Sequence, residues 1–249
     1  MIPAIRAEFR KLMTLRSTYV IIGSCIAITV FFAFYLEGYR STADVALPTK
    51  LASAVTSAAQ ALGLFIALAG VLLVTHEYRY NTIMYTLSAA RSRTQVLLAK
   101  IVVVSVFSIL LTLFVCSLAP WLTQLGLQAK GLSLVPQDFP IFDLLMKSAF
   151  YGWGYSMIAL IIAFIVRNQV GALGFLFLFP GLGELLLGLL LKNNAIYLPF
   201  SALGSVIRNG GAMLGQVPFP LTKSVGVVLA YIVGGWLVAW ILLMRRDAS

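Results

Sequence analysis

Six long apolar stretches dominate the pattern of hydrophobic and polar positions along this chain. A helix that crosses a bilayer needs roughly 20 mostly apolar residues, because each residue advances about 1.5 Å along the helix axis. The apolar positions are continuous and do not alternate with polar ones, as they would in the strands of a membrane barrel. We therefore expect an all-α integral membrane protein with six transmembrane helices. The expected spans are residues 19–36, 55–75, 96–118, 144–166, 170–191 and 225–244.

The composition fits one membrane domain that covers residues 1–249. Hydrophobic residues make up 61% of the chain and charged residues 10%, against roughly 45–50% and 25% in soluble domains. No internal repeat is visible. No small-residue cleavage site follows the first span, so we expect the basic N-terminal segment to be retained rather than removed as a signal peptide.

The basic residues predict the orientation of the chain. With the N-terminus inside, eleven of the 18 Lys and Arg residues fall on the inner side and seven on the outer side. The positive-inside rule therefore favours cytoplasmic positions for both termini. The formal net charge of +10 does not indicate a nucleic-acid partner, because the basic residues flank membrane spans, where anionic lipid headgroups account for them.

Residues 1–18 have the pattern of an amphipathic helix that lies in the inner membrane interface. The apolar positions recur at helical spacing: Ile2, Ile5, Phe9, Leu12 and Met13. The basic residues fall largely on other faces: Arg6, Arg10, Lys11 and Arg16. The segment is either an interfacial helix with a role in the mechanism or an anchor that only sets topology.

A charged insert at residues 76–95 separates the second and third spans. It reads HEYRYNTIMYTLSAARSRTQ, which is too polar for lipid and too long for a tight turn. The apolar residues Ile83, Met84 and Leu87 suit one face of a short helix, which Asn81 or Thr82 can cap. Ser88 can cap the segment that leads into the third span. The insert either docks a soluble partner or serves as a basic loop that sets topology.

Glu184 is an acidic residue inside the fifth span. A charge deep in lipid is costly, so its side chain normally faces protein or water. Pro180, Gly181 and Gly183 precede it and predict a broken helix. Glu184 is either a pathway or gating residue, with Pro180 beside it, or a carboxylate satisfied by the broken backbone or by Lys192.

The longest outer segment covers residues 192–224. We expect a short helix over residues 195–207, ended by Asn209 and the two glycines after it. Its apolar residues allow it to fold partly back into the outer leaflet, and an ordinary interfacial helix is the alternative.

Motifs for other chemistry are missing from the sequence. One histidine, His76, and two cysteines in apolar spans form no zinc motif, and there is no phosphate-binding loop of the form GxxxxGK[ST]. The Gly-x-Ser patterns at Ser133 and Ser156 lack the second glycine of a nucleophile elbow. We expect no catalytic residue, metal site or cofactor site in this chain.

Two segments resemble permeases of the second type of ATP-binding-cassette (ABC) transporter. The insert is similar to the first cytoplasmic loop of that family, and Ala7–Thr18 is similar to its amphipathic N-terminal helix. A weaker likeness covers Tyr197–Leu203, in the family's outer loop. The matching residues of the insert are Glu77, Arg79, Thr82, Leu87, Ser88, Arg91, Arg93 and Lys100. Asn81 stands where the family usually has Gly, and Asn tolerates positive φ better than most residues.

The resemblance implies the membrane half of an exporter in a bacterial plasma membrane. Two permease chains, identical or closely related, would pair, and each would dock a separate ATPase subunit that binds ATP and magnesium. The residues expected to couple to the ATPase are Glu77, Arg79, Thr82, Ile83, Met84, Leu87, Arg91 and Arg93. The alternatives are a stand-alone secondary transporter or channel that uses Glu184 as an ion or proton site, and a substrate-capture subunit of a vitamin importer. The sequence does not indicate the substrate.

Overall fold

The computed structural model describes residues 1–40, 47–89, 92–132, 140–208 and 219–245. These residues form helices, turns and short connections, with no strand in the described ranges. Six helical segments are long and apolar enough to cross a membrane, which confirms the predicted fold class. They are Arg16–Tyr39, Lys50–Arg79, Arg93–Ala129, Ile141–Val166, Gln169–Tyr197 and Leu221–Arg245.

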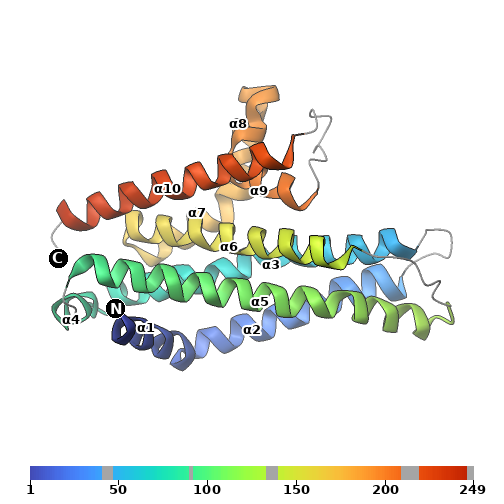
Figure 1. The fold of residues 1–249 in the computed structure, drawn as a ribbon, viewed down its shortest axis with the longest axis horizontal. Coiled ribbons are helices and arrows are strands. Elements are labelled where there is room, and N and C mark those ends of the chain that lie inside the picture. The colour runs from blue at the N-terminus through green and yellow to red at the C-terminus, as the bar shows by residue number, and fades with distance from the viewer. Residues whose placement is uncertain (41–46, 90–91, 133–139, 209–218, 246–249) are drawn as a thin grey trace.

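Figure 1 shows the helices of the described residues. The chain as far as the end of the third span contains α1 (Ile2–Thr14), α2 (Arg16–Thr29), the π-helix η1 (Val30–Tyr39), α3 (Leu47–Arg79), α4 (Ile83–Ala89) and α5 (Arg93–Ala129). The rest contains α6 (Ile141–Val166), α7 (Gln169–Leu178), the π-helix η2 (Phe179–Gly183), α8 (Glu184–Leu191), the 3₁₀ helix η3 (Lys192–Tyr197), α9 (Pro199–Ile207) and α10 (Leu221–Arg245).

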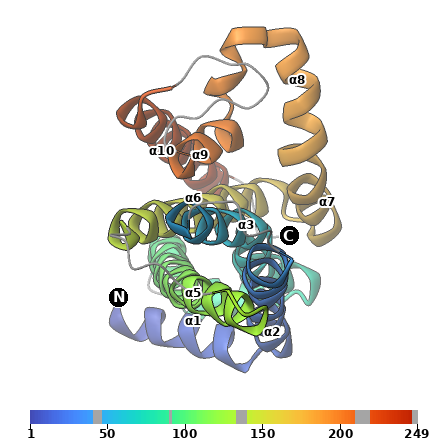
Figure 2. The ribbon, with the colours of Figure 1, turned by 90° about the vertical axis from the view of Figure 1, so that its right-hand side faces the viewer.

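Helices α3 and α6 lie at the centre of the bundle (Figure 2). In their most apolar windows 67% and 72% of the residues are buried, against 11% for the fifth span. Glycines allow the close contacts: a Cβ on Gly63 of α3 would lie 2.6 Å from the ring of Tyr151 of α6. The outer spans therefore leave most of their apolar surface for lipid or for another protein.

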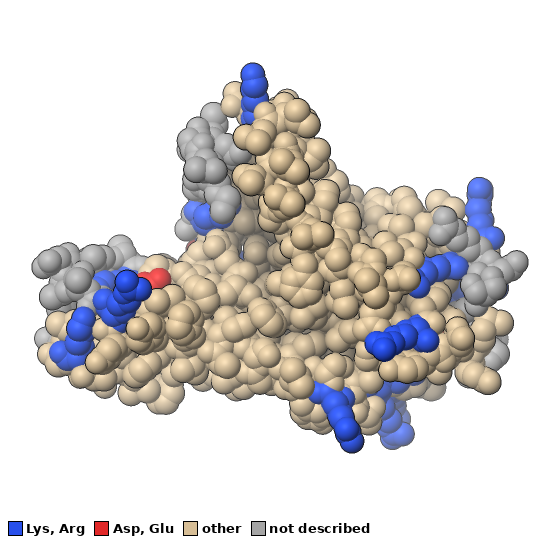
Figure 3. Space-filling view, turned by 180° about the vertical axis from the view of Figure 1, so that it is seen from behind, with Lys and Arg blue, Asp and Glu red and all other residues tan. Residues whose placement is uncertain are grey.

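Both chain ends and α4 lie at the same end of the bundle (Figure 1). Helix α5 has 37 residues and is therefore about 55 Å long, well beyond the roughly 30 Å hydrocarbon core. Figure 3 shows that Lys and Arg side chains gather toward the ends of the molecule, with a broad surface of uncharged side chains between them. Helix α5 is therefore longer than the hydrocarbon core is thick.

Two local predictions were wrong in detail. The helix of the fifth span does not break at Pro180 but continues through the π-helical turn η2. A π turn accommodates the proline because it changes the hydrogen-bond pattern without ending the helix. The N-terminal helix ends at Thr14, where Leu15 is extended, so Arg16 begins α2 instead of lying on α1.

Candidate functional site

The connection from α3 to α4 is a tight turn built on Asn81. Asn81 has φ 54°, which confirms that an asparagine can take the place of the glycine at this position. The backbone N–H of Thr82 donates to the carbonyl oxygen of Glu77 at 2.9 Å, and α4 begins at the next residue. The turn therefore fixes α4 directly to the end of the second span.

Four charged side chains at this end form a closed set, which we call the charge ring: Glu8, Lys11, Glu77 and Lys100. Lys11 Nζ lies 2.7 Å from both Glu8 Oε1 and Glu77 Oε1. Lys100 Nζ lies 2.7 Å from Glu8 Oε2 and 3.0 Å from Glu77 Oε1. Each cation thus contacts both carboxylates, and the ring joins α1, α3 and α5.

Each lysine of the charge ring has three hydrogen-bond acceptors: the two carboxylates and one further oxygen. The third donor position of Lys100 is directed to the carbonyl oxygen of Leu73 at 3.1 Å, and that of Lys11 to the hydroxyl of Thr86 at 3.2 Å. Thr86 in turn donates to Glu77 Oε1 at 3.4 Å. Because Thr86 belongs to α4, this hydroxyl connects the short helix to the ring.

Three members of the charge ring are buried. Lys100 is 0% exposed, Glu8 2% and Glu77 6%. Burial by itself lowers the pKa of Lys11, but hydrogen bonds and charge attraction from Glu77 and Glu8 together raise it above the ordinary value. Lys11 therefore stays protonated at neutral pH. Burying an ion pair removes both charges from water, and this desolvation offsets much of the attraction between them. The pairs therefore serve mainly to fix one arrangement of the helices, and removing one partner strongly destabilises the protein.

The exposed surface of α4 differs from the predicted apolar face. Ile83 is only 4% exposed, so it faces its own chain and is not available to a partner, whereas Met84 is 55% and Tyr85 76% exposed. The side chain of Leu87 and the whole of Arg91 lie outside the described residues. A docking surface on α4 would therefore be centred on Met84 and Tyr85, with the exposed Thr82 at its start.

The two described arginines of the coupling set make contacts within the chain. Arg79 donates to the side-chain oxygen of Gln169 at 3.2 Å. Arg93 donates to the carbonyl oxygen of Leu243 at 3.0 Å, and Arg167 to that of Leu242 at 3.2 Å. A helix C-terminus presents unsatisfied carbonyls and a partial negative charge. Arg93 and Arg167 thus hold the C-terminal end of the sixth span.

A comparison with protein families bears on this architecture. A model described as "ABC-2 family transporter protein" matches residues 4–180, more than half of the chain. The chain belongs to the ABC-2 transporter family. It is therefore a multi-pass ABC permease, and permeases of this family generally work with an ABC ATPase. No curated protein matches the chain.

In this permease the sequence located the insert but not the partners of its glutamate. Glu77 pairs with Lys11 and Lys100, which come from two other helices. Ser92, not Ser88, caps α5: its side chain accepts from the N–H of Gln95 at 3.2 Å. The one local signal was the spacing of Glu8 and Lys11, which places both on one helix face.

The predicted interfacial residues divide into two groups. Arg6, Phe9, Arg10 and Arg16 are exposed, as side chains that meet headgroups and lipid would be. Lys11 instead points into the charge ring. Helix α1 is thus bound to the bundle by its charged residues as well as by Leu12, which is 1% exposed.

Glu184 is satisfied by the outer helix α9 and not by Lys192. Its carboxylate accepts from the N–H groups of Phe200 and Ser201, both at 2.7 Å, and from the Ser201 hydroxyl at 2.6 Å. Pro199 is the first residue of α9 and has no N–H. The N–H groups of Phe200 and Ser201 are therefore the first backbone donors of the helix. The carboxylate therefore acts as an N-terminal cap supplied by another helix.

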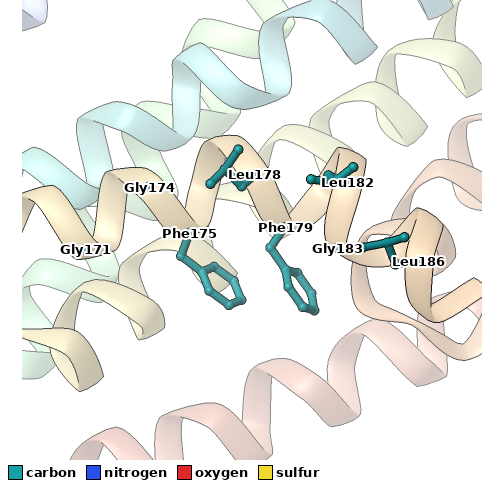
Figure 4. A pocket seen from close by; sticks show the side chains of 8 residues that line it. All are labelled: Gly171, Gly174, Phe175, Leu178, Phe179, Leu182, Gly183 and Leu186. Atoms are coloured by element: carbon teal, nitrogen blue, oxygen red, sulfur yellow. The ribbon is translucent and has the colours of Figure 1, made fainter.

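The surface hollow beside Glu184 has no polar side chain (Figure 4). It holds about 410 Å³ along α7 and η2, and its lining consists of glycine, leucine and phenylalanine. Glu184 is not among these residues. Nor does the described part of the chain bring together three metal-binding side chains anywhere. This geometry favours a structural role for Glu184 over the ion site that a secondary transporter needs.

Proposed function

We propose that the protein is the permease subunit of an ATP-driven exporter in a bacterial plasma membrane, with both termini in the cytoplasm. In this proposal two permease chains, identical or closely related, form the translocation pathway. Each docks a separate ATPase subunit, and that subunit binds the ATP and magnesium. The permease itself carries out no catalysis.

The observation that carries the proposal is the attachment of α4 to the charge ring. Thr86 connects α4 to Lys11 and Glu77, and the ring continues from there into α1 and α5. A force applied to α4 would therefore reach three membrane-associated helices without passing through a flexible linker. A loop that only sets topology has no need of such a buried network.

The exposed residues of α4 and its turn suit a protein partner. Tyr80 is 64% exposed, and Met84 and Tyr85 are also exposed. Tyrosine and methionine are enriched at protein interfaces. In this proposal these three residues lie on the cytoplasmic side of the membrane, where a soluble ATPase could reach them.

The second permease copy has support from the distribution of buried surface. The fifth span is the least buried of the six, at 11% of its most apolar window. A pathway between two chains would use such unpartnered surface, and lipid would cover the remainder.

Co-purification with the ATPase subunit tests the docking surface. We expect Met84→Ala combined with Tyr85→Ala to abolish recovery of the ATPase with the permease, since truncating one interface anchor commonly costs about 1–3 kcal/mol or more. The measurement is the ratio of ATPase to permease after purification from the same membranes, together with the ATP hydrolysis rate.

The matched control is Met146→Ala combined with Tyr39→Ala. These residues have the same side chains and are 44% and 47% exposed, but they belong to the opposite end of the bundle. Full recovery of the ATPase with the α4 double mutant would show that the docking surface lies elsewhere. A permease that transports without any ATPase would refute the exporter proposal.

A further inference from the structure

A groove lies between the end of α1, the inner end of α3 and helix α4. It holds about 450 Å³. Its apolar wall comes from Leu15, Leu72 and Leu73, and its polar rim includes Tyr80, Thr82 and Thr86. An apolar wall and a hydroxyl-bearing rim at the membrane surface suit a molecule with a hydrocarbon tail and a polar head.

One polar atom in the wall of this groove has no partner. Glu77 lines the groove, and its Oε2 atom is buried without a hydrogen bond within the described residues. The charge ring explains this: Lys11, Lys100 and Thr86 all use Oε1. Buried carboxylate oxygens normally accept hydrogen bonds, so Oε2 is an unused acceptor beside the groove.

The missing group must be a hydrogen-bond donor, and a protonated amine suits it best. A carboxylate accepts but cannot donate, and an ammonium offers donors together with the opposite charge. The ring pairs two carboxylates with two ammonium groups, so a zwitterionic headgroup would leave its charge balance unchanged. Arg16, exposed and directly after Leu15, supplies positive charge close by for a headgroup phosphate.

We propose that this groove binds an inner-leaflet phospholipid with a primary amine headgroup, of the phosphatidylethanolamine class. The ammonium bonds Glu77 Oε2, and one acyl chain lies along Leu15 and Leu72. Because Oε2 is covered, a rim side chain shifts before the headgroup reaches it. The inference rests on the proposed function only in placing this end of the bundle at the cytoplasmic leaflet.

Two phospholipids with the same acyl chains provide the sharpest test. Dioleoyl phosphatidylethanolamine and dioleoyl phosphatidylcholine have the same net charge, but choline has no N–H donor. We expect native mass spectrometry of the full-length permease in detergent to show ethanolamine lipid bound at several-fold lower concentration than choline lipid. Equal binding of the two lipids would overturn the proposal.

Variants that fill the groove test its location. Leu72→Trp, and Thr14→Trp at an exposed position that also lines the groove, should remove the preference for ethanolamine lipid. Leu110→Trp in α5, at a residue that is 62% exposed and outside the groove, should keep the preference for ethanolamine lipid. The Thr14 variant covers the case in which the Leu72 variant does not fold. A preference that survives in every folded groove-filling variant would place the site elsewhere.

The same binding experiments distinguish the phospholipid from two other occupants of the groove, a soluble amphiphile and the ATPase. If dodecylamine, a soluble amine with one alkyl chain, binds more tightly than the phospholipid, the site takes soluble amphiphiles and the lipid assignment is wrong. If the purified ATPase displaces bound ethanolamine lipid, the groove belongs to the protein interface and the assignment is also wrong. The lipid titration uses the permease alone without nucleotide, so its result does not depend on whether the exporter proposal holds.

Discussion

At the scale of single residues, Lys100 has an unusual environment. Its ammonium is fully buried between Glu8 and Glu77, and the carbonyl oxygen of Leu73 satisfies its third donor position. The energy of such a site depends on every partner being present, because a lone buried carboxylate has no compensating charge.

Replacing Lys100 by methionine should therefore destabilise the permease strongly. The substitution keeps an unbranched side chain, one atom shorter, but leaves Glu8 and Glu77 facing each other with only Lys11, at a cost of about 3–5 kcal/mol. The loss should appear as a lower midpoint in thermal unfolding of the detergent-solubilised protein.

Lys223→Met is the control for Lys100→Met, because Lys223 is exposed at the start of α10. It should leave the midpoint nearly unchanged. Adding Glu8→Gln to Lys100→Met should recover part of the lost stability, since the excess negative charge is then removed. Additive losses from the two substitutions would mean that the residues do not act as a ring.

Glu184 should hold α9 in place. Glu184→Ala leaves the N–H groups of Phe200 and Ser201 and the Ser201 hydroxyl without their acceptor, and each buried unsatisfied donor costs about 1–3 kcal/mol. We expect faster hydrogen exchange across Phe200–Ile207, with Asp143→Ala, a half-exposed carboxylate at the start of α6, as the control. Unchanged exchange in α9 would leave Glu184 open to a pathway role.

The sequence analysis singled out Glu77 and Glu184, but it did not identify the residues that bind their carboxylates. A charged residue in or beside an apolar span is conspicuous on its own. The groups that satisfy it come from other helices, and only the packing of those helices brings them together. Lys100, inside the third expected span, was named only as a residue that matches the family's insert, and Glu8 was not singled out.

At the scale of helices, the packing of η1 against α5 depends on glycine. A Cβ on Gly126 would lie 2.9 Å from Gly38 Cα and closer still to the carbonyl oxygen of Phe34. Backbone atoms cannot rotate aside as a side chain can. Thr123 adds a hydrogen bond to the carbonyl oxygen of Ala33 at 3.1 Å. The first and third spans thus approach each other at backbone contact distance.

Gly126→Ala should separate these two spans and destabilise the protein by about 1–3 kcal/mol, the usual cost of overpacking. Gly226→Ala in α10 is the matched control, because nothing lies within 4 Å of its Cβ position. Alanine is a better helix former than glycine by roughly 0.5–1 kcal/mol, so the control should be neutral or slightly stabilising. Equal midpoints for the two variants would contradict this packing.

The existence of the helices was predictable, but their ends and irregularities were not. Six apolar runs translate directly into spans, because lipid requires the backbone to be satisfied within each helix. The ends follow from caps such as Ser92 and from the turn at Asn81, where several residues were plausible. The π-helix η1 lies in backbone contact with α5 at Gly38 and Gly126, and a single segment does not encode such a contact.

At the scale of the whole molecule, the fold is compatible with the orientation that the charges predict. Both termini and α4 lie at one end of the bundle (Figure 1), as an even number of spans requires. The charge ring is also at this end, so the groups proposed to receive force from an ATPase lie on the side where ATP would be available. Reversing the protein in the membrane would separate α4 from any cytoplasmic ATPase.

Single-cysteine labelling tests this orientation in a background without Cys25 and Cys116, which are both buried. We expect a membrane-impermeant maleimide added to intact cells to label Asn194→Cys and to spare Ser92→Cys. Both positions are exposed, but in the proposed orientation Asn194, after α8, lies on the outer side and Ser92, before α5, on the inner side. Permeabilised cells should label at both positions, which shows that each cysteine is reactive. Labelling of Ser92→Cys together with protection of Asn194→Cys in intact cells would invert the protein. It would place α4 outside the cell, and the exporter proposal would fail with it.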